Sequence, residues 1–180
     1  LREEFVRVVA ALVEVARTGH VIMTCGNGGS AADAEHIVGE LMKGFLIPRP
    51  VPKGFRNNLV RDHGEQGENL ADHLQQGIRA ISLVGHPALA TAYGNDVAPE
   101  MVFAQQVYAL GRAGDALIGL STSGNAGNVI KAFQVGKTMG VTCIAFTGED
   151  GGRLAKLSDH CLQVPVRETY RVQELHLPLY

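Results

Sequence analysis

The chain has 180 residues, a hydrophobic content of 46% and a formal net charge of −2. This length allows one α/β domain with a buried core and is too short for two such domains. The scattered Lys and Arg residues form no basic stripe, which argues against nucleic-acid binding, and no apolar stretch approaches the roughly 20 residues that cross a bilayer.

The first third of the chain predicts a helix, a strand and a second helix. Apolar side chains recur at helical spacing over residues 2–18, and Gly19 follows where a C-terminal cap is favoured. A short buried strand is expected at Val21–Cys25, and a helix at Ala31–Phe45 starts beside the glycine-rich turn after it. The first helix has no obvious partner within a single doubly wound layer, so we expect it to pack against copies of itself.

Residues 46–78 interrupt this rhythm with three prolines, a polar stretch and a weakly amphipathic patch near 70–78. A connection of this length is either a mobile or partner-contacting loop with a short helix, or a lid that touches ligand. His63 and His73 lie inside it and are interpreted as solvated side chains.

Strands and helices alternate over the remaining residues. We expect strands at 80–84, 115–120, 141–146 and 159–164, a short helix after Pro87, a turn at Gly94–Asp96, and helices at 99–110, 126–139, after 152 and from about Tyr170. This order predicts an α/β fold with a doubly wound, mostly parallel five-stranded sheet and helices on both faces. Ligands of such sheets bind beyond the carboxyl ends of the strands.

Three cysteines, Cys25, Cys143 and Cys161, lie far apart and each is in or beside an apolar run. An odd number with this placement indicates reduced core thiols, which fits a cytoplasmic protein.

Two similar turns follow two of the predicted strands. Ser121-Thr-Ser-Gly-Asn125 comes directly after the apolar run 116–120, and Gly26-Asn-Gly-Gly-Ser30 comes after the strand at 21–25. A single Ser/Thr/Gly turn is often an ordinary helix cap. Two of them at the same end of one sheet place hydroxyls and free helix N–H groups together, which predicts a site for a small phosphorylated molecule.

Two further groups of polar residues are candidates for chemistry. His36 and Glu40 are four residues apart, so they share one helix face and form a zinc-binding pair, a general base with its neighbour, or a plain surface pair. Gly39 between them suggests close packing or ligand approach, because a mid-helix glycine costs about 1 kcal/mol. Gln173 and His176 lie in the last helix, where plain surface exposure is the alternative.

Five ordered motifs together resemble the sugar isomerase (SIS) domain family, in particular its phosphoheptose isomerase branch. They are Cys25–His36, Gly94–Asp96, Ser121–Asn125, Thr147–Gly152 and Arg171–His176, and the resemblance covers nearly the whole chain except 46–78. It implies an aldose–ketose isomerase that converts sedoheptulose 7-phosphate to D-glycero-D-manno-heptose 7-phosphate through an enediol, for bacterial surface polysaccharide.

The resemblance also implies roles for individual residues. Ser121, Thr122 and Ser123 match the phosphate cradle, and Glu40 matches the catalytic base. The remaining matches are Asn27, Gly28 and Gly29 with the adjoining Ser30 for substrate, Asn95 and Asp96 for sugar hydroxyls, and His36, Glu40 and Gln173 for one zinc ion. Family members are typically homotetramers with sites at subunit borders.

The chain departs from the family pattern in three ways. The second catalytic residue of the family, a histidine eight positions after the motif glutamine, falls at position 181, so we expect the chain to be a fragment shortened at both ends; His176 is too early for this role. Ala126 stands where a serine hydroxyl usually binds phosphate, and the insertion at 46–78 is much longer than usual.

Two alternatives to this function remain open. One is an isomerase or epimerase of another phosphosugar, and the other is a non-catalytic adaptor or sensor, like the homotetrameric relative that binds the replication initiator DnaA. That relative lacks a carboxylate where Glu40 stands, so Glu40 favours an enzyme.

Overall fold

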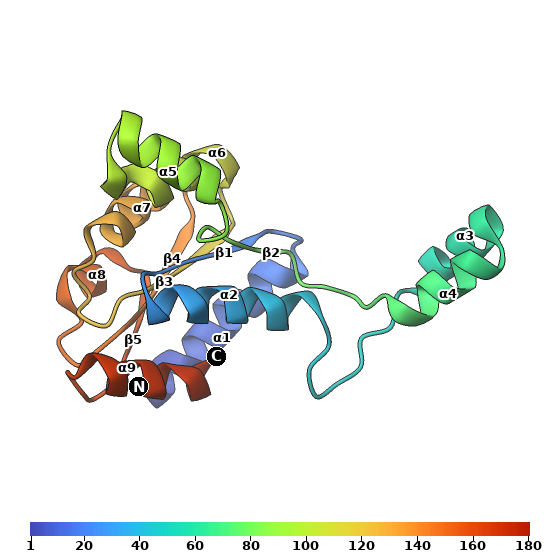
Figure 1. Ribbon diagram of the computed structural model, residues 1–180. Coiled ribbons are helices and arrows are strands. Elements are labelled where there is room, and N and C mark those ends of the chain that lie inside the picture. Colours follow the sequence, from blue (N-terminus) through green and yellow to red (C-terminus); the bar gives the residue numbers. More distant parts are fainter.

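A five-stranded parallel sheet organises the structure, a computed structural model that describes residues 1–180 (Figure 1). The strands are β1 (Ile22–Cys25), β2 (Ala80–Ser82), β3 (Ala116–Leu120), β4 (Thr142–Thr147) and β5 (His160–Gln163). They lie in the order β2-β1-β3-β4-β5, and every neighbouring pair is parallel. This is the flavodoxin-like order, in which the strand sequence reverses direction between β1 and β3. The predicted fold class is confirmed.

Helices cover both faces of the sheet (Figure 1). One face carries α1 (Arg2–Arg17), α2 (Gly29–Met42) and α9 (Thr169–His176). The other carries α5 (Pro87–Asp96), α6 (Val102–Leu110), α7 (Gly127–Thr138) and α8 (Gly152–Leu157), with short 3-10 turns at Pro99–Met101 and Leu177–Leu179. None of the helices combines the length and the apolar character needed to cross a membrane.

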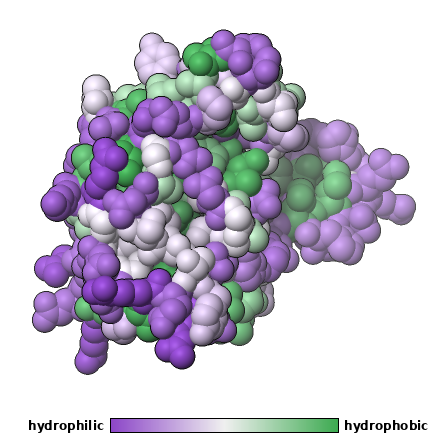
Figure 2. Space-filling model, turned by 60° about the vertical axis from the view of Figure 1, so that its left-hand side comes forward, coloured by the Kyte–Doolittle hydropathy of each residue, from purple (hydrophilic) through white to green (hydrophobic).

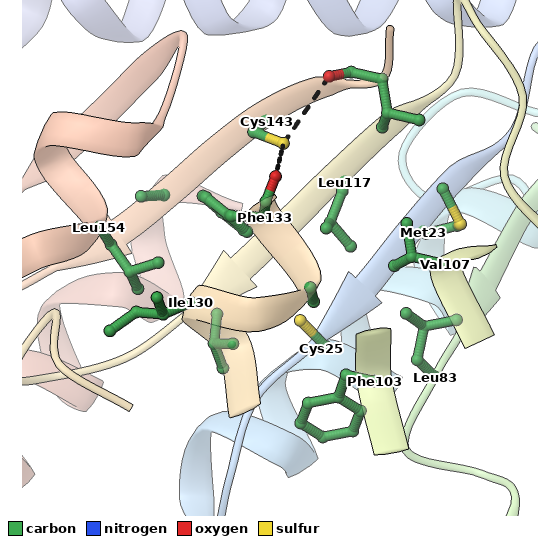
Figure 3. Packing of buried hydrophobic residues seen from close by; sticks show 14 residues of the cluster. Met23, Cys25, Leu83, Phe103, Val107, Leu117, Ile130, Phe133, Cys143 and Leu154 are labelled. Carbon is green, nitrogen blue, oxygen red and sulfur yellow. Dashed lines mark hydrogen bonds between the residues drawn. The ribbon is translucent and has the colours of Figure 1, made fainter. Parts of the chain in front are cut away.

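The core consists of two clusters, one on each face, because successive strand residues point to opposite sides. In β3, Leu117 contributes to the cluster beneath α6 and α7, whereas Ile118 contributes to the cluster beneath α1 and α2. Figure 3 shows the first cluster, in which Phe133 of α7 packs among strand residues that include Cys143. All three cysteines are free, as predicted.

Helix α1 differs from its prediction because it does have a partner within the chain. Val8 and Val15 are buried against the sheet in the second cluster. A different stripe of the same helix, made of Val6, Val9 and Val13, is 62%, 42% and 58% exposed. The helix therefore packs on its own sheet and still presents an apolar outer surface.

The insertion at 46–78 forms a hairpin of two helices, where the sequence left open either a loop with one short helix or a lid over the ligand. Helices α3 (Lys53–His63) and α4 (Glu65–His73) pack against each other and project from the sheet on two extended segments (Figure 1). Gly67 lies directly against the carbonyl of Leu59, an approach that leaves no room for a side chain. Figure 2 shows the hairpin as a separate lobe with hydrophobic side chains at its surface, where Phe55, Leu70 and Leu74 are exposed.

The segment Gly94–Asp96 also differs from its prediction, since it is the last turn of α5 and not an independent turn. Pro87 occupies the first turn of this helix, where its missing N–H costs nothing, and the helix continues for ten residues.

Candidate active site

A cavity of about 410 Å³ lies at the carboxyl ends of β1 and β3. Three elements that are distant in the sequence contribute its walls: the turn before α2, the turn after β3, and helix α9. The lining residues are Asn27, Gly28, Gly29, Ser30, Leu120, Ser121, Thr122, Ser123, Ala126, Thr169 and Gln173. The structure thus brings together eight of the predicted substrate-binding residues.

Two helices begin at this cavity without a side-chain cap. Helix α2 starts at Gly29 after Gly28, whose φ of 58° turns the chain from the strand into the helix. Helix α7 starts at Gly127 after Ala126. The first N–H groups of a helix have no partner in the helix itself and carry its positive dipole end. Together the two helix ends favour an anion between them.

The turn at Ser121–Asn125 adds hydroxyl donors to these N–H groups. The Ser121 hydroxyl oxygen accepts the N–H of Ala126 at 3.4 Å, and that of Ser123 accepts the N–H of Asn125 at 3.2 Å. A hydroxyl that accepts a hydrogen bond keeps its own proton for donation. Ser121 is 6% exposed, so a donor at this position faces little competition from bulk water.

A reciprocal pair of amides joins the two turns. Asn27 Nδ2 donates to Asn128 Oδ1 at 2.9 Å, and Asn128 Nδ2 donates to Asn27 Oδ1 at 2.8 Å. The predicted substrate contact of Asn27 is therefore limited to its backbone while this pair is intact. Asn128 was missed in the sequence because its partner is 101 residues away.

Helix α9 closes one side of the cavity with Thr169 and Gln173. The Gln173 amide lies against Gly29, where an added Cβ would come within 2.5 Å of Gln173 Nε2. Gly29 is thus required for this close approach of side chain to helix. Thr169 was not predicted, and no pattern in the sequence marks it.

His36 and Glu40 lie farther along α2 and do not line this cavity. His36 Nε2 is 3.7 Å from Glu40 Oε1, and Lys43 Nζ binds both Glu40 carboxylate oxygens at 3.1 and 3.0 Å. The Glu40 side chain is 29% exposed. Gly39 is exposed, and an added Cβ there would meet nothing within 4 Å, so the close approach expected at this glycine is absent within the chain.

The far side of His36 is occupied by Tyr180. The Tyr180 hydroxyl is 3.4 Å from His36 Nδ1 and donates to Asp33 Oδ1 at 2.9 Å. Burial and the nearby Asp33 carboxylate raise the pKa of Tyr180, so it keeps its proton. Neither Asp33 nor Tyr180 was a predicted site residue.

The other predicted residues lie apart from the cavity. Asn95 and Asp96 are exposed at the end of α5, where Asn95 Nδ2 donates to Asp96 Oδ1 at 2.9 Å, and neither lines the cavity. His176 is fully buried with Nε2 3.3 Å from the Thr147 carbonyl oxygen, and burial lowers the pKa of this imidazole. His176 therefore has a structural position, consistent with its exclusion from the catalytic set.

Helix α2 links an anion-binding end to a carboxylate-bearing end. Gly29 lies in the cavity, and Glu40 is eleven residues later, about 16 Å along the helix axis. An extended seven-carbon phosphosugar is shorter than this axial separation, so one that is bound in the cavity by its phosphate does not reach the backbone of Glu40. Side chains of a helix lean toward its N-terminus, which brings the Glu40 carboxylate closer to the cavity.

The predicted zinc ligands fit a metal only in part. Two donors bound to tetrahedral zinc at about 2.1 Å are roughly 3.4 Å apart, close to the 3.7 Å between His36 Nε2 and Glu40 Oε1. Gln173 lies beside Gly29, about two helical turns from His36, and no group of three His, Cys, Asp or Glu side chains is gathered. One chain therefore supplies a converging pair of donors and not the full predicted set.

Comparisons with known proteins agree with the fold. The SIS domain family model matches residues 67–148. The phosphoheptose isomerase of Aneurinibacillus thermoaerophilus is 37% identical over 179 residues, 97% of this chain and 77% of the relative. That of Burkholderia pseudomallei is 39% identical over 170 residues, 94% of this chain and 73% of the relative.

Two solved structures agree as well. Phosphoheptose isomerase GmhA from Neisseria gonorrhoeae has a TM-score of 0.78 and 35% identity, covering 98% of this chain and 80% of that one. A phosphoheptose isomerase from Francisella tularensis has a TM-score of 0.81 and 28% identity, covering 99% and 82%. With this extent of identity and structural similarity, the chain belongs to the phosphoheptose isomerase family of SIS-domain proteins.

Proposed function

We propose that this protein isomerises sedoheptulose 7-phosphate to D-glycero-D-manno-heptose 7-phosphate. The observation that carries this proposal is the cavity at the ends of β1 and β3, where two uncapped helix N-termini and the Ser121–Ser123 hydroxyls surround space for a phosphate. Relatives of 37–39% identity over nearly the whole chain are named phosphoheptose isomerases, which supports a seven-carbon substrate.

In this mechanism Glu40 is the base. Its carboxylate removes a proton from C1 of the ketose, the C1–C2 bond gains double-bond character, and the C2 oxygen is protonated to give an enediol. Return of a proton to C2, with loss of the C1 hydroxyl proton, yields the aldose, so no atom is gained or lost. A positioned base contributes about 10²- to 10⁴-fold to such a transfer.

The phosphate end supplies orientation. The Ser121, Thr122 and Ser123 turn and the first N–H groups of α2 and α7 hold the phosphate, while Gln173 and the backbone of Asn27–Ser30 bind nearby sugar hydroxyls. Binding energy at this remote group positions C1 and C2 without taking part in the reaction. Asn95 and Asp96 are assigned to sugar hydroxyls on family resemblance alone.

We also propose one zinc ion per subunit, held by His36 and Glu40 with Gln173 as a further ligand. When bound, zinc acts as a Lewis acid that polarises the sugar carbonyl. The spacing of His36 and Glu40 supports the pair, and the position of Gln173 requires a rearrangement or a neighbouring subunit.

A homotetramer is the assembly that we propose. The exposed stripe of Val6, Val9 and Val13 on α1 supports this, because burial of apolar side chains at about 25 cal/mol per Å² favours association. Light scattering tests it, and a monomer would contradict it. The three free thiols support a reducing compartment, the cytoplasm.

Conversion of sedoheptulose 7-phosphate, followed by NMR with and without added zinc, tests the reaction. The variant Glu40→Gln should lose at least about 100-fold in kcat. Glu35→Gln is the matched control, since Glu35 is an exposed carboxylate of α2 outside the cavity, and it should retain activity. Absence of aldose product from the full-length protein under both conditions would refute the proposed reaction.

A further inference from the structure

The hydroxyl proton of Tyr180 is used in a hydrogen bond to Asp33. The hydroxyl donates to Asp33 Oδ1 at 2.9 Å, and the other carboxylate oxygen, Oδ2, is buried without any hydrogen-bond partner. An ionised carboxylate only accepts hydrogen bonds, and a phenol has one proton to give. Tyr180 is the only hydrogen-bond donor to this half-buried carboxylate, so rotation of the O–H away from it would leave the charge without a partner.

The direction of this proton determines whether the Tyr180 hydroxyl is a hydrogen-bond donor or an acceptor toward His36. With its proton directed at Asp33, the phenol oxygen presents a lone pair to His36 Nδ1, which is 3.4 Å away. The two rings meet edge to face with centroids 5.6 Å apart, which holds the imidazole in this orientation. A lone pair facing Nδ1 favours a proton on Nδ1, and in a neutral imidazole this leaves Nε2 unprotonated.

Unprotonated Nε2 is the atom that faces Glu40. The separation of 3.7 Å from Glu40 Oε1 is too long for a hydrogen bond and close to that of two ligands on one cation. We propose that Asp33 and Tyr180 form a positioning pair that selects the Nδ1–H tautomer of His36 and so prepares Nε2 as a metal ligand. The proposal rests on the proposed function only through the zinc ion, because the tautomer is a property of the metal-free protein.

Histidine tautomers measured by long-range ¹H–¹⁵N NMR on the metal-free full chain provide the first test. The wild-type protein should show His36 with its proton on Nδ1. In Asp33→Asn the new amide can donate to the phenol oxygen, which frees the Tyr180 proton for His36 Nδ1 and should shift the population toward Nε2–H. A dominant Nε2–H form in the wild type, or no change in Asp33→Asn, would overturn the proposal.

Zinc affinity from competition with a chromophoric chelator provides the second test. Replacement of an outer partner of a histidine ligand typically weakens metal binding about 10- to 100-fold, and we expect this from both Asp33→Asn and Tyr180→Phe. Tyr170→Phe is the matched control: Tyr170 is 60% exposed on α9 and should leave the zinc Kd unchanged. Equal Kd values for Tyr180→Phe and the wild type would also overturn the proposal.

The two tests separate this inference from the proposed function. If the wild type binds no zinc but shows the Nδ1–H tautomer, the proposed zinc ion is wrong and the positioning pair stands. If zinc binds and the tautomer is Nε2–H, the positioning pair is wrong and the metal proposal stands. Thermal unfolding of each variant shows whether it is folded. If Tyr180→Phe does not fold, Asp33→Asn provides the test, because it keeps the shape of the side chain.

Discussion

Substitution of Gly29 by alanine should displace Gln173 from the cavity while the fold is preserved. The new Cβ would lie 2.5 Å from Gln173 Nε2 and 2.8 Å from Cδ, well inside the roughly 3.5–4 Å of normal contact. The atoms in its way belong to the end of a flexible side chain, so Gln173 moves and the backbone does not. Loss of one neutral hydrogen bond to substrate costs about 0.5–1.5 kcal/mol, a roughly 2- to 13-fold rise in KM.

Steady-state kinetics and thermal unfolding of Gly29→Ala, Gln173→Ala and the double variant measure this effect. Because both single changes remove the same contact, the double variant should have the KM of Gln173→Ala and not the product of the two effects. Gly39→Ala is the matched control on the same helix. Its Cβ meets nothing within 4 Å, so it should leave KM unchanged. Additive effects at Gly29 and Gln173, or a KM for Gly29→Ala equal to that of the wild type, would refute the reasoning.

Four further predictions concern stability and reactivity. Gly39→Ala should raise stability by about 0.5–1 kcal/mol, roughly 1–4 °C in Tm, and a fall would reveal a neighbour packed over α2. Gly124→Ala should lower the free energy of unfolding by about 2 kcal/mol or more in urea titrations, because φ is +64° and the Cβ would strike the Gly151 carbonyl; a loss below about 0.5 kcal/mol would contradict this. Burial works to raise the pKa of Asp159, but hydrogen bonds from Lys137 and the Cys143 N–H lower it below its ordinary 3.8. The stabilisation from Asp159 is therefore present above about pH 4 and lost as the pH falls through the folded-state pKa. Asp159→Asn should reduce the fall in the free energy of unfolding at acid pH. An unchanged fall would exclude Asp159 as its source. Burial raises the pKa of Cys143 to about 12, so Ellman's reagent should label this thiol only after unfolding.

The sheet was predictable from the sequence because each strand is a short apolar run that ends in a turn. All five strands lie within two residues of their expected bounds, and the order of strands and helices indicated the parallel sheet. Helix α2 was less well placed at both ends, since Gly29 and Ser30 belong to it and it stops at Met42. A helix that begins at a glycine and ends just before a polar residue has few sequence features that mark its ends.

The hairpin at 53–73 was not predictable by hydrophobic periodicity. Neither α3 nor α4 buries a large apolar side chain, and their contact depends on Gly67 and Ala71, which carry almost no hydrophobic signal. Small residues that permit close helix contact are read in the sequence as helix breakers or as neutral positions.

The candidate site was predictable as far as its local motifs extend. Both turns were expected at one edge of the sheet, and they meet there because β1 and β3 are neighbours. The contacts of Asn27 with Asn128 and of Asp33 with Tyr180 span 101 and 147 residues, and no pattern within one segment indicates such a pair. Conversely, Glu40 and Gln173 were predicted to bind the same zinc ion. Glu40 lies near the C-terminal end of α2, whereas Gln173 of α9 lies beside Gly29 at the N-terminal end of α2. Only the three-dimensional path of α9 reveals this separation.

The hairpin is joined to the sheet by two extended segments, which are paired with each other through an isolated bridge between Pro50 and Gln75. A unit attached in this way unfolds without disrupting the strands, so its amides should exchange with deuterium earlier than those of β1, β3 and β4. Native-state hydrogen exchange should thus resolve two cooperative units in this protein, the weaker of which is the hairpin. A protease would be expected to cleave this segment first and leave the sheet folded as a nicked but continuous core.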